Sequence, residues 1–267
     1  MKKTTSFQEL LKVMKILRGP KGCPWDKEQD HASLKQYLIE ETYEVIDTID
    51  DNDMSKLKEE LGDLLLQVVF HAQIAEDQNE FTIDDIIQTL IEKLTRRHPH
   101  VFGDKNLSSA EQVLKQWHKI KKAEHGTKRP SVIDGVPRKL PALQKAHKLQ
   151  KKASRVGFDW DHIDKVLAKV DEELQEVKEA IKTNDKKHIY DELGDLLFST
   201  ANLSRFLGLD PEGALRGTIR KFTSRFQTIE KELSRKGKKL EDASLAEMDA
   251  IWNKAKKIKS KNEKGKR

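Results

Sequence analysis

Apolar residues recur at helical spacing along most of the chain. Near the beginning they form one stripe on a helix, at Phe7, Leu10, Leu11, Met14 and Leu17. The same period predicts further helices at residues 34–49, 54–75, 83–97, 108–122, 143–154, 166–181 and 219–233, and another after residue 185. No segment alternates as a strand does. The pattern therefore predicts an all-α protein.

The second half of the chain repeats the first at an offset of 132 positions. Five acidic residues correspond in order, Glu172, Glu173, Glu176, Glu192 and Asp195 to Glu40, Glu41, Glu44, Glu60 and Asp63. An Asn-Asp turn and a Leu-Gly-Asp-Leu-Leu run also repeat. A period this long indicates a duplicated domain rather than a solenoid.

Between the copies, four residues interrupt the helical period: Pro130, Gly135, Pro137 and Pro141. We therefore expect a first domain at residues 1–125, a linker at 126–141 and a second domain at 142–267. The second domain ends in a basic tail, KSKNEKGKR, which we expect to be solvated and disordered.

Each copy carries two acidic pairs whose members lie three residues apart. In the second copy, Glu173 and Glu176 lie on one predicted helix, and Glu192 and Asp195 lie on the next. This spacing puts both members of a pair on one side of a helix, so antiparallel packing would bring four carboxylates together. Asp195 lies in an apolar run and is expected on a largely buried helix, where an ionised carboxylate is costly without a cation.

A set of carboxylates indicates the kind of cation. Oxygen ligands suit hard divalent ions, so the pattern favours Mg²⁺, with Mn²⁺ as an alternative. Di-iron bundles use Glu-x-x-His pairs, and no histidine stands at the matching positions, which argues against a di-iron centre.

Basic and aromatic residues of the second copy add a pattern typical of a nucleotide site. Lys221 and Arg225 lie one helical turn apart and can neutralise phosphate charge, and Trp252 can stack on a base. A water bound to the metal could then attack a phosphorus atom. No Gly-rich P-loop is present, which argues against a Walker-type ATPase.

The chain resembles the MazG family of nucleoside triphosphate pyrophosphohydrolases, within the all-α NTP pyrophosphatase superfamily. The resemblance rests on the motif Glu-Glu-x-x-Glu, a spacer and Glu-x-x-Asp, at residues 172–195 and again at 40–63. The segments GCPWDKEQDH, RRHPHVFG and DGVPRKLPALQKAHKLQKKASRVGFDW support it, and it covers nearly the whole chain. It implies tandem helical bundles, Mg²⁺-dependent hydrolysis of NTPs (ATP among them) to NMP and diphosphate in nucleotide clean-up, and a homodimer with sites near the subunit interface.

The resemblance also implies roles for individual residues. The catalytic metal ligands would be Glu173, Glu176, Glu192 and Asp195. The substrate-binding residues would be Lys169, Glu172, Asp191, Lys221, Arg225 and Trp252. The family favours the second copy as the catalytic one, but the first keeps a corresponding set that could form a second site: Glu41, Glu44, Glu60, Asp63, Lys93, Arg97 and Trp117.

The amino-acid composition indicates the cellular compartment in which the protein is expected. The single cysteine, Cys23, excludes an internal disulfide and fits a reducing cytoplasm. No apolar stretch approaches the ~20 residues that a membrane span needs, so no membrane partner is expected. The N-terminal segment is amphipathic and charged, as in a helix rather than a secretory signal.

Two other functions stay open. A non-catalytic, nucleotide-binding regulatory protein would use the same residues without turnover, which stays open chiefly for the first copy. The net charge of +6 and the pI of about 9.1 suggest nucleic acid, but the basic residues are spread along the chain and only 6% of residues are aromatic, so no specific nucleic acid is expected. Trp25 and Trp160 are interpreted as structural, and Cys23 as non-catalytic.

Overall fold

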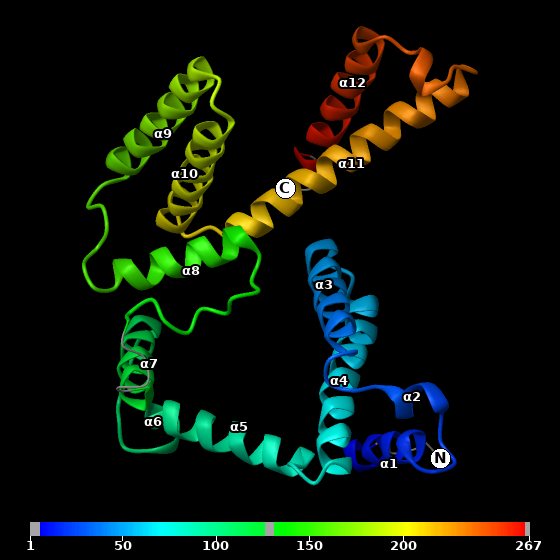
Figure 1. Ribbon diagram of the computed structural model, residues 1–267, viewed down its shortest axis with the longest axis vertical. Helices are drawn as coiled ribbons and strands as arrows, with labels where there is room; N and C mark the ends of the chain where they lie inside the picture. The colour runs from blue at the N-terminus through cyan, green and yellow to red at the C-terminus, as the bar shows by residue number, and fades with distance from the viewer. Residues whose placement is uncertain (1–5, 126–130, 265–267) are drawn as a thin grey trace. The chain divides into compact units, whose positions relative to one another are not determined.

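The structure, a computed structural model, describes residues 6–125 and 131–264 of the 267-residue chain. It divides into two compact units, unit 1 (residues 1–125) and unit 2 (residues 126–267). Figure 1 shows helices joined by turns and loops, and no strand occurs in the described residues. The all-α prediction is therefore confirmed. None of the described helices is long and apolar enough to cross a membrane.

The helices of unit 1 are α1 (Phe7–Arg18), α2 (Pro24–Glu28), α3 (Lys35–Asp51), α4 (Met54–Asp77), α5 (Ile83–Arg97), α6 (Pro99–Phe102) and α7 (Ala110–His125). Side chains fix two of the helix starts, because Ser6 and Thr82 form capping boxes with Glu9 and Asp85 at the beginnings of α1 and α5. Helices α1, α3 and α5 all pack on α4, which makes α4 the central helix of the unit.

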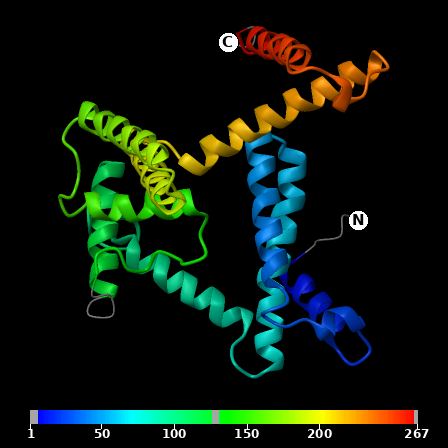
Figure 2. The ribbon, with the colours of Figure 1, turned by 45° about the horizontal axis from the view of Figure 1, so that its top comes forward.

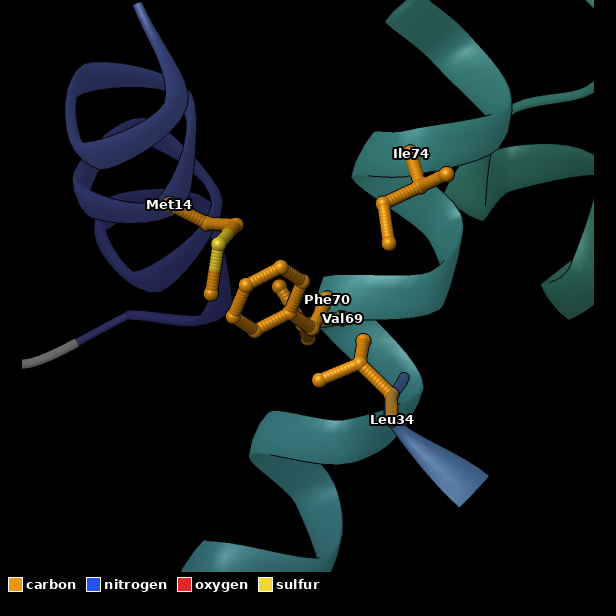
Figure 3. Packing of buried hydrophobic residues seen from close by; sticks show 5 residues of the cluster. All are labelled: Met14, Leu34, Val69, Phe70 and Ile74. Atoms are coloured by element: carbon orange, nitrogen blue, oxygen red, sulfur yellow. The ribbon is translucent and has the colours of Figure 1, made fainter. Parts of the chain in front are cut away.

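The core of unit 1 lies where α1 meets α4. Figure 3 shows its buried members: Met14, Leu34, Val69, Phe70 and Ile74. Met14 belongs to the predicted stripe of the first helix, and the other side chains come from α4 and from the residue that precedes α3. The helical period of the sequence therefore identifies the side of α1 that is buried.

The Gly-Cys-Pro-Trp turn between α1 and α2 is structural. A Cβ atom on Gly22 would lie 2.0 Å from the carbonyl oxygen of Leu17, so only glycine fits there. The Trp25 ring then contacts Tyr37 and Phe70 edge-on, at centroid distances of 5.8 and 6.4 Å. These contacts agree with the structural interpretation of Trp25.

Replacing Phe70 by alanine is expected to destabilise unit 1 by about 3–5 kcal/mol, because the substitution removes a ring that is only 3% exposed and leaves a cavity in the core. Chemical denaturation followed by circular dichroism measures the effect. Phe102→Ala removes a ring that is 62% exposed in the same unit and should change stability little. Equal effects of the two substitutions would contradict this account of the core.

Two histidines of unit 1 face each other. The Nδ1 atoms of His31 and His71 lie 2.8 Å apart in a hydrogen bond, and the rings stack at 5.1 Å. Burial, together with the charge of His31 when it is protonated, lowers the pKa of His71. The folded state therefore favours the neutral ring.

The stabilising contribution of this pair is expected to be complete above the unfolded pKa of about 6.5 and to be lost as the pH falls through the lower folded value. Loss of the hydrogen bond between the two rings corresponds to about 1 kcal/mol. Unfolding of the wild type and of His71→Gln at pH 7.5 and at lower pH measures this contribution. Parallel pH profiles for the two proteins would show that the pair does not contribute.

The helices of unit 2 are α8 (Ala142–Ser154), α9 (Ile163–Thr183), α10 (Lys186–Phe206), α11 (Pro211–Arg235), the 3₁₀ helix η2 (Leu240–Asp242) and α12 (Leu245–Lys264). Helices α8 and α9 pack on α10, and α12 packs on α11. Figures 1 and 2 both show α9 and α10 side by side. Of the expected linker, residues 126–130 lie outside the described residues, and residues 131–141 form turns and coil before α8 begins.

Helix α10 is less buried within one chain than its sequence suggests. The side chains of Leu193, Leu197 and Phe198 remain 46%, 53% and 47% exposed, and Asp195 is exposed as well. The prediction that Asp195 lies on a largely buried helix is therefore wrong for a single chain. The reason is that the helices of the chain that pack on α10, which are α8, α9 and α11, leave Asp195 exposed.

The basic C-terminal segment also differs from expectation. Helix α12 continues to Lys264, so the prediction of a disordered tail is wrong as far as that residue, and residues 265–267 lie outside the described residues. The cause is local, since the lysines and Glu263 favour a helix and no proline interrupts the segment.

Candidate functional site

In each copy, a tight Asn-Asp turn joins the two acidic helices. In unit 2, Asn184 ends α9 in the left-handed conformation (φ 57°), and the Asp185 side chain accepts hydrogen bonds from the first backbone N–H groups of α10. In unit 1, Asn52 (φ 55°) and Asp53 do the same between α3 and α4. The short connection makes each pair of helices antiparallel neighbours.

The α9–α10 hairpin gathers three of the predicted carboxylates. Oxygen atoms of Glu173, Glu176 and Glu192 all lie within 4.8 Å of one another, and Glu173 is only 6% exposed. Partial burial and repulsion from Glu173 and Glu192 raise the pKa of Glu176. The fourth predicted ligand, Asp195, is exposed and is not part of this group.

Lys169 borders the acidic group from the same helix. Its Nζ lies 2.8 Å from a carboxylate oxygen of Glu172 and 2.7 Å from one of Glu173. The hydrogen bonds that Lys169 donates to these two carboxylates raise its pKa, so the ammonium stays charged. The predicted substrate residues Lys169 and Glu172 therefore lie beside the cluster, whereas Asp191 is exposed on α10.

The first copy assembles a similar group from α3 and α4. Oxygens of Glu41, Glu60 and Asp63 lie within 4.8 Å of one another, and all three side chains are half-buried. Burial and the neighbouring Asp63 and Glu44 raise the pKa of Glu41, so Glu44 lies close by although it is not in the group. Each of the four predicted ligand positions therefore joins a cluster in at least one copy.

The donors in both clusters fit a hard divalent cation. All are carboxylate oxygens, and their mutual repulsion would be relieved by a bound positive charge. Glu173, Glu176 and Glu192 could hold such an ion in unit 2, and Glu41, Glu60 and Asp63 could hold one in unit 1.

The predicted basic and aromatic residues of unit 2 meet on α11 and α12. The Arg225 guanidinium lies over the Trp252 ring, 5.3 Å from its centroid, and Phe222 contacts the same ring at 5.4 Å. The buried Nε of Arg225 has no hydrogen-bond partner among the described residues. Lys221 is exposed. No hydrogen bond or ion pair in the described part of the chain joins Lys221 or Arg225 to the acidic cluster, so one chain does not connect the two groups.

The first copy pairs the corresponding residues differently. Arg97 lies 5.8 Å from the centroid of Trp117, but its guanidinium is also ion-paired with Glu124 of α7 at 2.6 Å, whereas Lys93 is half-buried on α5. The sequence interpretation did not single out Glu124. The available signal was the comparison of the repeats, because Lys259 stands at the same distance after Trp252 as Glu124 does after Trp117.

The fold and the clusters define an all-α protein with two copies of a helical hairpin that gathers carboxylates. The sequence profile of the MazG nucleotide pyrophosphohydrolase domain matches residues 29–102 and 162–229, which together make up more than half of the chain. These matches contain both acidic hairpins. The chain therefore belongs to the MazG family.

Similar proteins extend along nearly the whole chain. A nucleoside triphosphate pyrophosphohydrolase/pyrophosphatase MazG from Thermotoga maritima is 51% identical over 94% of this chain and 95% of its own. A nucleoside triphosphate pyrophosphohydrolase from Escherichia coli K12 is 43% identical over 94% of this chain and 97% of its own. Among solved structures, a mazG-related protein from Thermotoga maritima matches 43% of this chain and 98% of its own, with 30% identity and a TM-score of 0.38.

Proposed function

We propose that the protein hydrolyses nucleoside triphosphates to the monophosphate and diphosphate, using a divalent cation, Mg²⁺ in the cell, with Mn²⁺ as a substitute. The observation that carries the proposal is the group of three carboxylates on the α9–α10 hairpin, within the segment that matches the family. The names of the two full-length relatives support the same activity. A reducing cytoplasm is the compartment we propose, and removal of unwanted nucleotides the role.

In this proposal water adds to the α-phosphorus, the α–β anhydride bond breaks, and diphosphate leaves. A cation bound by the carboxylates would stabilise the charge of the phosphates and lower the pKa of a coordinated water. Lys169 holds Glu172 and Glu173 in place through its two ion pairs. Asp195 is the fourth proposed ligand, one turn beyond Glu192 on α10.

Substrate contacts are assigned to the second basic group. Arg225 offers guanidinium N–H groups to phosphate oxygens, and Lys221 adds a second positive charge. Trp252, over which Arg225 lies, offers a ring for stacking against the base, and Asp191 borders the nucleotide. The substrate is free nucleoside triphosphate rather than nucleic acid.

The acidic group and the basic group come together, in this proposal, in a homodimer. The apolar side chains of Leu193, Leu197 and Phe198 on α10 are exposed in one chain and would be covered by a second copy. Analytical ultracentrifugation tests the assembly, and a monomer at micromolar concentration would contradict it.

The activity is tested by measuring diphosphate release from a panel of NTPs with Mg²⁺, for the wild type, Glu44→Ala and Glu176→Ala. We expect the wild type to be active and Glu176→Ala to lose nearly all of that activity. Loss in Glu44→Ala as well would mean that the two copies cooperate. A wild type that binds NTPs but releases no diphosphate from any of them would favour the non-catalytic regulatory protein instead.

A further inference from the structure

In unit 1, the arginine that corresponds to Arg225 is paired with a carboxylate of the same chain. Glu124 accepts hydrogen bonds from Nη2 of Arg97 at 2.6 Å and from its Nε at 3.1 Å, and Arg96 donates a further one at 2.8 Å. The side chains of Arg97 and Glu124 are only 15% and 16% exposed. The arginines hold the pKa of Glu124 at about 2, so this carboxylate is ionised at neutral pH.

This two-point contact is the one that a phosphate group makes with arginine. A guanidinium presents its N–H groups as a planar fork, and the fork matches the oxygens of a carboxylate or a phosphate equally well. While Glu124 is bound there, those donors of Arg97 are used, and an incoming phosphate would meet a negative charge in the same place.

The ring of Trp117 in unit 1 is also in contact with charged side chains of the protein. The Lys121 ammonium lies 4.4 Å from the centroid of the Trp117 ring, on an aromatic surface that a base would need for stacking. Arg97 lies 5.8 Å from the same centroid. Two side chains of the protein thus occupy the ring that corresponds to Trp252.

Unit 2 differs at this position. Arg225 lies over Trp252 as Arg97 lies over Trp117, yet the buried Nε of Arg225 has no hydrogen-bond partner among the described residues. The sequence places Lys259, not an acidic residue, at the position that corresponds to Glu124. Among the described residues, the carboxylate contact is therefore found in the first copy.

We propose that Glu124 is an internal occupant of a phosphate-type oxyanion site in unit 1, formed by Arg96, Arg97 and Lys121 beside Trp117. The site is closed while Glu124 pairs with Arg97, and it accepts a phosphate or diphosphate group once that charge is removed. The assignment rests on the proposed function in one respect, namely that Arg225 contacts phosphate and that Arg97 is its counterpart.

Inorganic diphosphate is the probe, and isothermal titration calorimetry of the full chain at low salt is the measurement. Arg225→Ala serves as the background, because it removes the proposed oxyanion contact of unit 2. Adding Glu124→Gln keeps an acceptor of the same size and removes only the charge. We expect the protein with both substitutions to bind diphosphate roughly tenfold more tightly than the background protein, measured as Kd.

Matched variants keep the result interpretable. Glu111→Gln removes a carboxylate of the same helix, which pairs with Lys115 on the surface, and should leave binding unchanged. Glu124→Lys introduces the residue type of unit 2 and should also increase binding. Adding Arg97→Ala to Glu124→Gln should abolish the gain. Circular dichroism confirms that each variant is folded.

The proposal is overturned if both folded Glu124 variants bind diphosphate no more tightly than the background, or if the gain survives Arg97→Ala. Because the measurement uses binding without turnover, it is separate from the test of the proposed function. That function fails if the wild type releases no diphosphate, whatever the Glu124 variants bind.

Discussion

Replacing Glu176 by alanine is expected to lower the rate of diphosphate release by roughly a thousandfold, because a bound cation supplies several kcal/mol of charge stabilisation to the transition state. Glu176 belongs to the carboxylate group of α9 and α10, and its raised pKa reflects repulsion from Glu173 and Glu192 as well as burial. In the proposed function Glu176 is a ligand of the cation, so its loss would weaken cation binding.

Two further variants, on the same two helices, are compared with Glu176→Ala. Glu179→Ala removes an exposed carboxylate of α9 that accepts a hydrogen bond from Gln175, and its rate should stay near that of the wild type. Asp195→Ala shows whether the exposed fourth carboxylate takes part. Near-normal turnover of Glu176→Ala with Mg²⁺ at saturating substrate would remove Glu176 from the ligand set.

Replacing Arg225 by alanine is expected to lower kcat/KM by roughly a hundredfold, the effect of losing one donor that stabilises developing negative charge. The buried Nε of Arg225 lacks a hydrogen-bond partner among the described residues, so no acceptor of the described chain uses that donor. Steady-state kinetics with ATP measure the change, and the separation of kcat from KM shows whether the contact forms in the ground state.

The control for Arg225 is Arg235→Ala, which removes an exposed arginine of the same helix that pairs with Glu232. Its kinetics should match those of the wild type. If Arg225→Ala also behaved as the wild type, Arg225 would have no part in the reaction.

The helices and the acidic hairpins could be predicted because their determinants are local. The apolar stripe that contains Met14, the capping turns at Asn52 and Asn184, and the i, i+3 carboxylate pairs each depend on residues close together in sequence. The family resemblance added the roles of these residues, and the profile match confirms the family itself.

The misses depend on contacts that the local pattern does not contain. The exposure of Asp195 is decided by which helices cover α10, and α8 and α9 cover only part of it. The role of Glu124 is decided by Arg97, which comes from α5 and is distant in sequence. An acidic residue on a charged helix resembles a solvated side chain until its partner is known.

The two-residue turn between the acidic helices has a consequence for the order of folding. The four proposed ligand carboxylates of the second copy lie within residues 173–195, and the corresponding four of the first lie within residues 41–63. Little loop-closure entropy therefore opposes the approach of the two helices. Each hairpin can therefore form early, without waiting for distant segments, and its like charges meet at that stage. A divalent cation that neutralises them would then increase the rate of folding as well as the stability of the final structure.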